Sequence, residues 1–369
     1  MEHAWRAVGD ELGPQLVLLV RNPAAGVEAA VVVDNVAAGP AIGGVRMSAQ
    51  VTVTEVARLA RAMTLKNAAA GLRHGGAKAG IFTDPPREPI LRERLLRAFA
   101  VAIRDLRDYI PGPDMGTDEA AMAWVYDEIG RCVGLPAALG GIPLDHLGAT
   151  GFGLVAAAEA AQEAGIVQLE GARLAVAGFG AVGAHAARFL AQRGARLVAV
   201  SDRRGAVMNP AGLDVAALRE LKGDGRCVGD YPGGVAVGRD DLYGVDCDIL
   251  IPAARPDVLT AANAGEVRAR LILQGANIPA TLDAEKILAA RGIVSVPDFI
   301  ANAGGVICGA IEYAGGTQAQ AFAEITERIR ANTSAVLRRA DEAQMLPRQA
   351  AEDLAVERVR AAMAFRRRF

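Results

Sequence analysis

The feature of this sequence that most limits its fold is a glycine pattern near the middle of the chain. Gly178-x-Gly180-x-x-Gly183 follows the apolar run 173–177 and precedes a stretch of helix formers that extends to about residue 192. A strand, a glycine turn and a helix in this order begin the parallel sheet of a Rossmann-type domain. Asp202 ends the next apolar run, where such domains carry an acidic residue. We therefore predict an α/β fold with a doubly wound parallel sheet.

The same motif predicts a dinucleotide-binding site. Its glycines allow a tight turn and bring backbone N–H groups and a helix N-terminus to the pyrophosphate. Asp202 can accept hydrogen bonds from the adenosine ribose, which favours NAD because a carboxylate repels a 2′-phosphate. Arg203 and Arg204 weigh against this preference, because either could bind that phosphate, so NADP stays open. The alternative is a glycine turn in a domain that binds no nucleotide. The predicted cofactor residues are Gly178, Phe179, Gly180, Ala181, Val182, Gly183, Asp202 and Arg203.

A second feature is a pair of lysines twelve residues apart. Lys66 lies in a run of helix formers, and Lys78 follows the pair Gly75-Gly76, where another segment or a ligand can come close. Burial and a neighbouring cation both lower the pKa of a lysine toward the range that a general base needs. From this stretch alone, two solvated surface lysines are an equally good interpretation.

The length of the chain and the interruption of its apolar pattern predict two domains. At 369 residues it is too long for one comfortable core, and glycine and proline interrupt the pattern near 135–147. We predict an N-terminal α/β substrate-binding domain over 1–140 and a Rossmann domain over 141–330. Helices within about 330–369 are expected to return and complete the first domain. Gln50–Thr54 is predicted as a short strand.

Composition excludes several classes of protein. The formal net charge is -2, which leaves no basic surplus for a nucleic-acid backbone, and Arg366-Arg367-Arg368 is predicted as a solvated helix end. Four cysteines without a CxxC pair and only four histidines predict no zinc or other metal site. There is no signal pattern and no apolar run of about 18 residues. We expect a soluble cytoplasmic protein with no nucleic-acid or membrane partner.

Taken together, these motifs resemble the glutamate/leucine/phenylalanine/valine dehydrogenase family over nearly the whole chain. The resemblance implies NAD(P)-linked oxidative deamination of an L-amino acid to a 2-oxo acid and ammonia, and the reverse. It also implies a homo-oligomer whose active-site cleft lies between the substrate domain and the Rossmann domain. The matching stretches are Gly39–Arg46, Met63–Asn67, Gly75–Lys78, Gly112–Asp114, Ala149–Gly151, Gly178–Gly183, Gln274–Asn277 and Pro297–Val306.

The roles that the family assigns transfer to matching positions of this chain. Lys66 would hold the substrate α-carboxylate, and Lys78 would act on the water that attacks the imine carbon. Asp114 would relay protons to and from the amine, because hydride leaves Cα only when the amine is neutral. An aspartate after Pro113 could instead serve only to form a turn.

Further positions carry over from the same resemblance. Thr150 and Asn277 are expected near the nicotinamide, and Asn302 beside the reacting centre. Asn302 could also cap the helix that follows it, and both interpretations can hold together. The residues expected to line the amino-acid end of the site are Gly43, Gly44 and Met63.

The side-chain pocket departs from the glutamate branch of the family. The residue before the first Gly-Gly pair is a lysine in that branch and is Ile42 here, and a small carboxylate-binding residue is replaced by Gly309. A buried substrate carboxylate would then lack a partner, so we predict an apolar L-amino acid such as phenylalanine, leucine or valine. The predicted walls are Ile42, Gly112, Val306 and Gly309, and the two glycines would leave room for a large or aromatic side chain.

Three alternatives remain open at this point. Arg46, Arg73 or His74 could reach the pocket and make the chain a glutamate dehydrogenase with an unusual side-chain contact. Segments 205–214 and 276–280 do look closer to the glutamate branch. The chain could also be a non-catalytic, NAD-responsive regulatory protein, or another Rossmann oxidoreductase that acts on a cyclic imine.

Overall fold

The computed structural model describes residues 9–366 and divides into two compact units. Unit 1 comprises the chain up to Leu144, Val306–Ala321 and the chain from Leu354 onward. Unit 2 comprises Asp145–Gly305 and Phe322–Asp353. The predicted division differs in the C-terminal part, where Val306–Ala321 joins unit 1 instead of the Rossmann domain. The reason is a buried carboxylate in this segment, Glu312, which binds backbone amides of unit 1.

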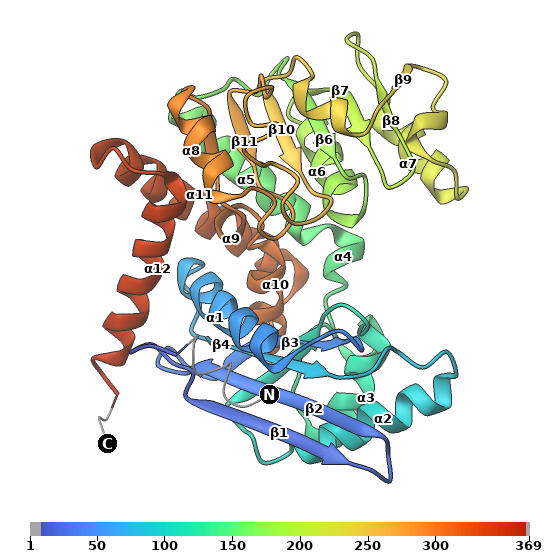
Figure 1. Ribbon diagram of the computed structural model, residues 1–369, viewed down its shortest axis with the longest axis vertical. Helices are drawn as coiled ribbons and strands as arrows, with labels where there is room; N and C mark the ends of the chain where they lie inside the picture. Colours follow the sequence, from blue (N-terminus) through green and yellow to red (C-terminus); the bar gives the residue numbers. More distant parts are fainter. Residues whose placement is uncertain (1–8, 367–369) are drawn as a thin grey trace. The chain divides into compact units, whose positions relative to one another are not determined.

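Unit 1 is built on a five-stranded mixed sheet (Figure 1). Its strands lie in the order β1-β2-β4-β3-β5. β1 pairs antiparallel with β2, and β2 pairs antiparallel with β4. β3 runs parallel to both β4 and β5 and therefore lies between the two strands that follow it in the chain. The strands are β1 (Leu16–Asn22), β2 (Val27–Asn35), β3 (Ala41–Met47), β4 (Gly75–Ile81) and β5 (Tyr109–Pro113).

Helices cover both faces of this sheet (Figure 1). α1 (Val53–Ala69) packs on one face, where a Cβ added to Gly76 would lie 2.0 Å from the backbone nitrogen of Thr64. α2 (Pro89–Ala102) and α3 (Glu119–Ile129) contribute Phe99, Met122 and Val125 to the core on the other face. The close approach of α1 to β4 is possible because β4 presents glycine to the helix.

The predicted strand over residues 50–54 is wrong, because this segment starts α1. The side chain of Thr52 accepts a hydrogen bond from the backbone N–H of Glu55 at 3.2 Å, which caps the helix and ends the extended stretch.

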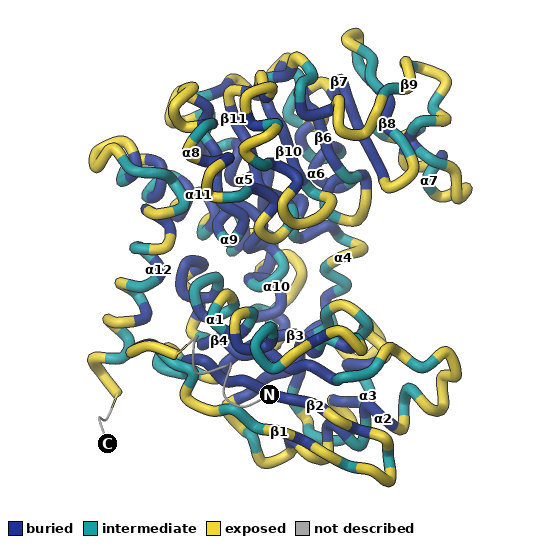
Figure 2. The backbone as a smooth tube through the Cα atoms, in the orientation of Figure 1, coloured by how far each residue is buried: buried dark blue, intermediate teal, exposed yellow. Residues whose placement is uncertain are grey.

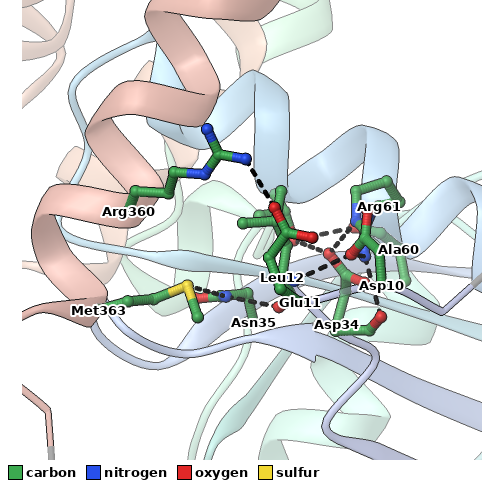
Figure 3. Close-up of polar contacts among 11 residues, drawn as sticks. Asp10, Glu11, Leu12, Asp34, Asn35, Ala60, Arg61, Arg360 and Met363 are labelled. Carbon is green, nitrogen blue, oxygen red and sulfur yellow. Dashed lines mark hydrogen bonds and ion pairs between the residues drawn. The ribbon is translucent and has the colours of Figure 1, made fainter.

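The N-terminal segment of unit 1 is held on the sheet by a cluster of ion pairs (Figure 3). Arg61 of α1 donates to both carboxylate oxygens of Asp10 at 2.7 Å and to the buried Asp34 at 2.9 Å. Burial works to lower the pKa of Arg61, but its hydrogen bonds to the two aspartates outweigh burial and raise that pKa. Arg360 of the last helix binds Glu11 at 2.6 Å, which joins that helix to this N-terminal segment.

Unit 2 contains a seven-stranded sheet in the order β12-β11-β10-β6-β7-β8-β9. β6, β7, β10, β11 and β12 are parallel, and β8 and β9 extend the sheet antiparallel at one edge. The parallel strands are short, apolar and buried, as expected for strands covered on both faces (Figure 2). Their bounds are β6 (Arg173–Ala177), β7 (Arg196–Ser201), β8 (Ala206–Met208), β9 (Val235–Val237), β10 (Ile249–Pro252), β11 (Leu271–Leu273) and β12 (Val294–Val296).

The helices of unit 2 connect these strands and cover the sheet. Three later helices belong partly to each unit. α10, α11 and α12 each contain a unit boundary within their length. This arrangement confirms the predicted two-domain α/β fold with a Rossmann-type sheet. The helices are α4 (Leu144–Leu147), α5 (Ala149–Glu163), α6 (Ala181–Ala191), α7 (Val215–Gly223), α8 (Leu282–Ala290), α9 (Asp298–Ala301), α10 (Gly304–Tyr313), α11 (Gln318–Glu342) and α12 (Pro347–Met363).

Two further sequence expectations concern the described residues. Between residues 9 and 366, no helix combines the length and apolar character needed to cross a bilayer. Within the same range, no three His, Cys, Asp or Glu side chains gather as metal ligands would. At the C-terminus, Arg366 donates to the carbonyls of Val36 and Ala37 at 2.9 and 3.0 Å, while Arg367 and Arg368 lie outside the described residues.

The contact between α1 and β4 predicts that Gly76→Ala destabilises unit 1. The added methyl group would overlap the α1 backbone, and overpacking of this kind costs about 1–3 kcal/mol. Urea unfolding followed by tryptophan fluorescence tests this, because Trp124 lies in α3 of the same unit. Gly223→Ala is the matched control, since a Cβ at that helical position meets nothing within 4 Å. Equal unfolding midpoints for the two variants would contradict the prediction.

Candidate active site

Lys78 and Asp114, which sequence analysis selected separately, form an ion pair in unit 1. Lys78 is buried in β4, and its Nζ contacts Oδ2 of Asp114, the residue directly after β5. The side chains are 9% and 15% exposed, so the pair is largely withdrawn from solvent. Two strands that are not neighbours in the sheet thus bring an acid and a base together over β3.

The carboxylate of Asp114 has further partners that hold its position. Oδ1 accepts a hydrogen bond from the backbone N–H of Met115 at 2.6 Å and lies 3.4 Å from Nη2 of Arg46. Burial raises the pKa of Asp114, but the charge and hydrogen bond of Lys78, with those of Arg46 and Met115, outweigh burial. The pKa of Asp114 therefore lies below its ordinary value, and the group is a carboxylate at neutral pH.

Glycine in β3 makes room for this carboxylate. A Cβ added to Gly44 would lie 2.8 Å from the Cβ of Asp114. Gly44 pairs with Gly112 of β5, and Ile42 pairs with Ile110 of the same strand. Because side chains alternate along a strand, Ile42, Gly44 and Arg46 share the face that α1 covers. Arg46 is fixed there by Glu55 of α1 at 2.6 Å.

Lys66 and Met63 lie on α1, the helix that covers this face. Lys66 is in the last turn, and both side chains are half-buried. Asn67, which the sequence analysis did not select, is fully buried and donates to the carbonyl of Gly75 at 2.7 Å. This bond ties the end of α1 to the start of β4, three residues before Lys78.

The predicted walls of the side-chain pocket also lie within unit 1. Ile42 is buried in β3, Gly112 lies in β5, and Val306 and Gly309 belong to the part of α10 that joins this unit. Val133, which the sequence analysis missed, contacts the positions of both glycines. No spacing in the sequence marks this residue.

The polar residues that might have entered the pocket have other partners. Arg46 pairs with Glu55 and Asp114. Nδ1 of His74 lies 3.0 Å from the carbonyl oxygen of Pro40, and its ring packs edge-on against Tyr313. Arg73 is exposed.

A cavity of about 440 Å³ in unit 2 is lined by the start of the glycine motif, Gly178, Phe179 and Gly180. It lies at the carboxyl ends of β6, β7 and β10, where the strand order reverses and doubly wound sheets bind nucleotides. The first residue of α6 follows Gly180, which provides no side-chain cap, and a Cβ there would meet nothing within 4 Å. The amides of this helix end are therefore suited to a pyrophosphate, and the site fits a dinucleotide. Gly183 has no such free space, because an added Cβ would lie 2.0 Å from the carbonyl oxygen of Gly178.

Asp202 lines this cavity, and its carboxylate accepts hydrogen bonds from the protein itself. Its carboxylate accepts from the backbone N–H groups of Arg204, Gly205 and Val228 and from Nζ of Lys222 at 2.6 Å. Burial raises the pKa of Asp202, but the hydrogen bond and charge of Lys222, with the N–H groups of Arg204 and Val228, outweigh burial and lower that pKa. The basic residues that line the cavity are Arg203, Lys222, Arg239 and Arg255, whereas the side chain of Arg204 binds the carbonyl of Gly225.

Thr150 and Asn277, predicted near the nicotinamide, and Asn302, predicted beside the reacting centre, also lie in unit 2. Asn302 follows α9, and its Nδ2 donates to Oδ1 of Asn277 at 3.2 Å. Thr150 is in the first turn of α5, where the backbone of Gly304 approaches it closely. The structure thus brings Asn277 and Asn302 together and packs the start of α10 against the start of α5.

Comparison with family models identifies the chain over both of its parts. Residues 15–131 match the Glu/Leu/Phe/Val dehydrogenase dimerisation domain, and residues 140–367 match the Glutamate/Leucine/Phenylalanine/Valine dehydrogenase model. The chain belongs to this family. It is an amino acid dehydrogenase, an oxidoreductase of the CH–NH₂ group that uses NAD or NADP.

Individual relatives agree with this assignment. The chain is 38% identical over 358 residues to glutamate dehydrogenase from Aeropyrum pernix, covering 90% of this chain and 85% of that protein. It is 41% identical over 293 residues to NADP-specific glutamate dehydrogenase from Saccharolobus shibatae, covering 76% of this chain and 69% of that protein.

Solved structures show the same fold. The hetero-hexameric glutamate dehydrogenase from Thermus thermophilus in its Leu-bound form gives a TM-score of 0.84 at 31% identity, covering 96% of this chain and 91% of that one. L-tryptophan dehydrogenase from Nostoc punctiforme gives 0.75 at 26% identity, with coverage of 96% and 98%.

The partners of Asp202 predict that Lys222→Met discriminates between the two cofactors. The variant loses a cation of the cavity and leaves Asp202 to repel a 2′-phosphate. Because a charged hydrogen bond contributes about 1.5–3 kcal/mol, the Kd for NADPH should rise about tenfold or more. The Kd for NADH should change much less. Fluorescence titration of both nucleotides measures this, with Lys286→Met, an exposed lysine of α8, as the control. An equal loss for both nucleotides would contradict it.

Proposed function

We propose that this amino acid dehydrogenase uses Lys66, Lys78 and Asp114 to deaminate its substrate. The observation that supports the proposal is the buried contact between Lys78 and Asp114 on glycine-bearing strands. Lys66 binds the substrate α-carboxylate, and the other two residues transfer protons. These are the roles that the family resemblance implies for the three positions.

The reaction begins with removal of a proton from the substrate ammonium group. Asp114 accepts this proton because its neighbours keep it ionised. Thr150 and Asn277 would hold the nicotinamide, which would supply the acceptor for the hydride of Cα and so leave an imine on the substrate. Lys78 gives its ammonium proton to solvent and, as the neutral amine, takes a proton from the water that attacks the imine carbon. Asp114 returns its proton to the departing nitrogen. The products are the 2-oxo acid, ammonium, the reduced cofactor and one proton.

Glutamate is the first candidate substrate. Both sequence relatives, at 38% and 41% identity, are glutamate dehydrogenases. The hexameric relative from Thermus thermophilus also carries this name, and its assembly supports the expectation that this chain forms an oligomer.

An apolar L-amino acid is the second candidate, and the chemistry of the pocket favours it. Ile42 is buried at the position of the lysine in the glutamate branch, and Gly309 offers no side-chain donor. Arg46 and His74 have partners elsewhere. A substrate carboxylate buried without a partner would lose its solvation and gain no compensating hydrogen bond. The tryptophan dehydrogenase among the solved relatives has an apolar substrate in its name.

A substrate panel decides between the two candidates. NADH and NADPH production is measured at alkaline pH with each of the twenty L-amino acids. Highest activity with glutamate supports the first candidate, and highest activity with valine, leucine, phenylalanine or tryptophan supports the second. Ile42→Lys sharpens the comparison, because it should raise glutamate activity only if residue 42 contacts the substrate side chain. No turnover with any amino acid, with cofactor still bound, would overturn the proposed roles.

The environment of Asp114 predicts a shift in the pH profile of Arg46→Met. Arg46 is one of the groups that lower the pKa of Asp114, so its removal raises that pKa. The protonated, inactive form then persists to higher pH, and the acidic limb of the kcat/KM profile moves upward. Arg21→Met, which removes an exposed ion pair with Glu28, should leave the profile unchanged. Superimposable acidic limbs for wild type and Arg46→Met would contradict the assignment of Asp114.

A further inference from the structure

Val133 fills the space that two glycines of the predicted side-chain pocket leave open. A Cβ added to Gly112 would lie 2.9 Å from Cγ2 of Val133, and one added to Gly309 would lie 3.6 Å from its Cβ and Cγ2. Gly112 belongs to β5 and Gly309 to α10, so one side chain contacts both walls. Val133 itself is only 5% exposed. The room that the two glycines suggested is therefore occupied by a third residue.

The backbone around Val133 is fixed on β5. Its N–H donates to the carbonyl of Pro111 at 2.8 Å, which continues the edge of the sheet. Gly134 packs so closely on Pro113 that an added Cβ would lie 2.5 Å from its Cδ. On the other side, the guanidinium of Arg131 binds the carbonyls of Ile103, Leu106 and Tyr109 at 2.8, 2.9 and 3.0 Å. Val133 therefore cannot swing away without breaking these contacts.

A buried carboxylate of α10 secures the same segment. Glu312 is 8% exposed and accepts from the N–H groups of Gly134 at 2.7 Å, Leu135 at 3.0 Å and Ile142 at 2.9 Å. Glu312 lies three residues after Gly309, so both project from neighbouring positions on one side of the helix. The helix side that presents Gly309 to the pocket thus also holds Val133 in place.

We propose that Val133 is the residue that limits the length and width of the substrate side chain, and that Glu312 is its positioning residue. The proposal rests on the proposed function, because it takes Gly112 and Gly309 as walls of the substrate pocket. It adds a size limit that holds for either candidate substrate, because the side chain of Val133 restricts the space between Gly112 and Gly309.

Val133→Ala tests the size limit. The variant removes two methyl groups from the wall, so it should shift preference toward longer side chains within the class that the wild type accepts. The measured ratio is kcat/KM for norleucine over norvaline, or for 2-aminoadipate over glutamate. Since one methylene in a pocket changes kcat/KM by about 10–200-fold, the ratio should rise at least tenfold. Val133→Phe should lower it.

Val125→Ala is the matched control, because Val125 is equally apolar and lies on α3, buried in the core of unit 1. It should lower thermal stability and leave the ratio unchanged. The proposed function and the role of Val133 are overturned by different results. A wild type that is inactive with every amino acid overturns the proposed function, whereas an active wild type with the same ratio in Val133→Ala overturns only the role of Val133.

Glu312→Gln tests the positioning role. An amide keeps the size of the side chain but offers one acceptor oxygen to three N–H groups. We expect KM for the preferred substrate to rise several-fold, kcat to change little, and the size ratio to move toward that of Val133→Ala. A fall in melting temperature with an unchanged ratio and an unchanged KM would overturn the positioning role and leave Glu312 as a stabilising residue only.

Discussion

The buried ion pair of Lys78 and Asp114 is the interaction on which the rest of unit 1 depends. Charges withdrawn from water lose solvation, so a pair of this kind persists only where geometry and further hydrogen bonds compensate. The sheet supplies both. Gly44 leaves space for the carboxylate, Met115 donates an amide to it, and Arg46 adds a second cation. A mixed sheet with glycine in its central strands is thus a requirement of the site.

The Rossmann unit could be predicted from sequence because its signals are local. Buried parallel strands appear as short apolar runs, and the turn after β6 needs Gly183 for close packing against Gly178. The partners of Asp202 could not be predicted in the same way. Lys222 comes from α7 and Val228 from the loop beyond it, and only the folded chain brings them to the carboxylate. A motif can therefore locate the nucleotide site without revealing which donors hold its acidic residue.

Unit 1 was harder to predict because the strands around Asp114 are rich in glycine and proline. β3 and β5 contain Gly43, Gly44, Pro111, Gly112 and Pro113, residue types that sequence patterns assign to loops. They are strands here because close approach of backbone and side chains is needed around Asp114. The contact of Glu312 with Gly134 joins residues 178 positions apart, and no periodicity indicates it. Residues of this kind become visible only when the fold is known.

Overall similarity and pocket chemistry can favour different substrates because they depend on different residues. Identity over several hundred residues reflects the scaffold and the catalytic groups, which every member of the family needs. Discrimination between substrates depends on the few atoms that contact the side chain, because a missing charge partner or one methyl group changes transition-state binding measurably. Ile42, Val133 and Gly309 are the positions that we propose for this role in this chain, and they are apolar, beside the ion pair of Lys78 and Asp114. A scaffold that keeps its acid and base can therefore change its substrate through three or four side chains, each held by contacts that lie outside the catalytic pair.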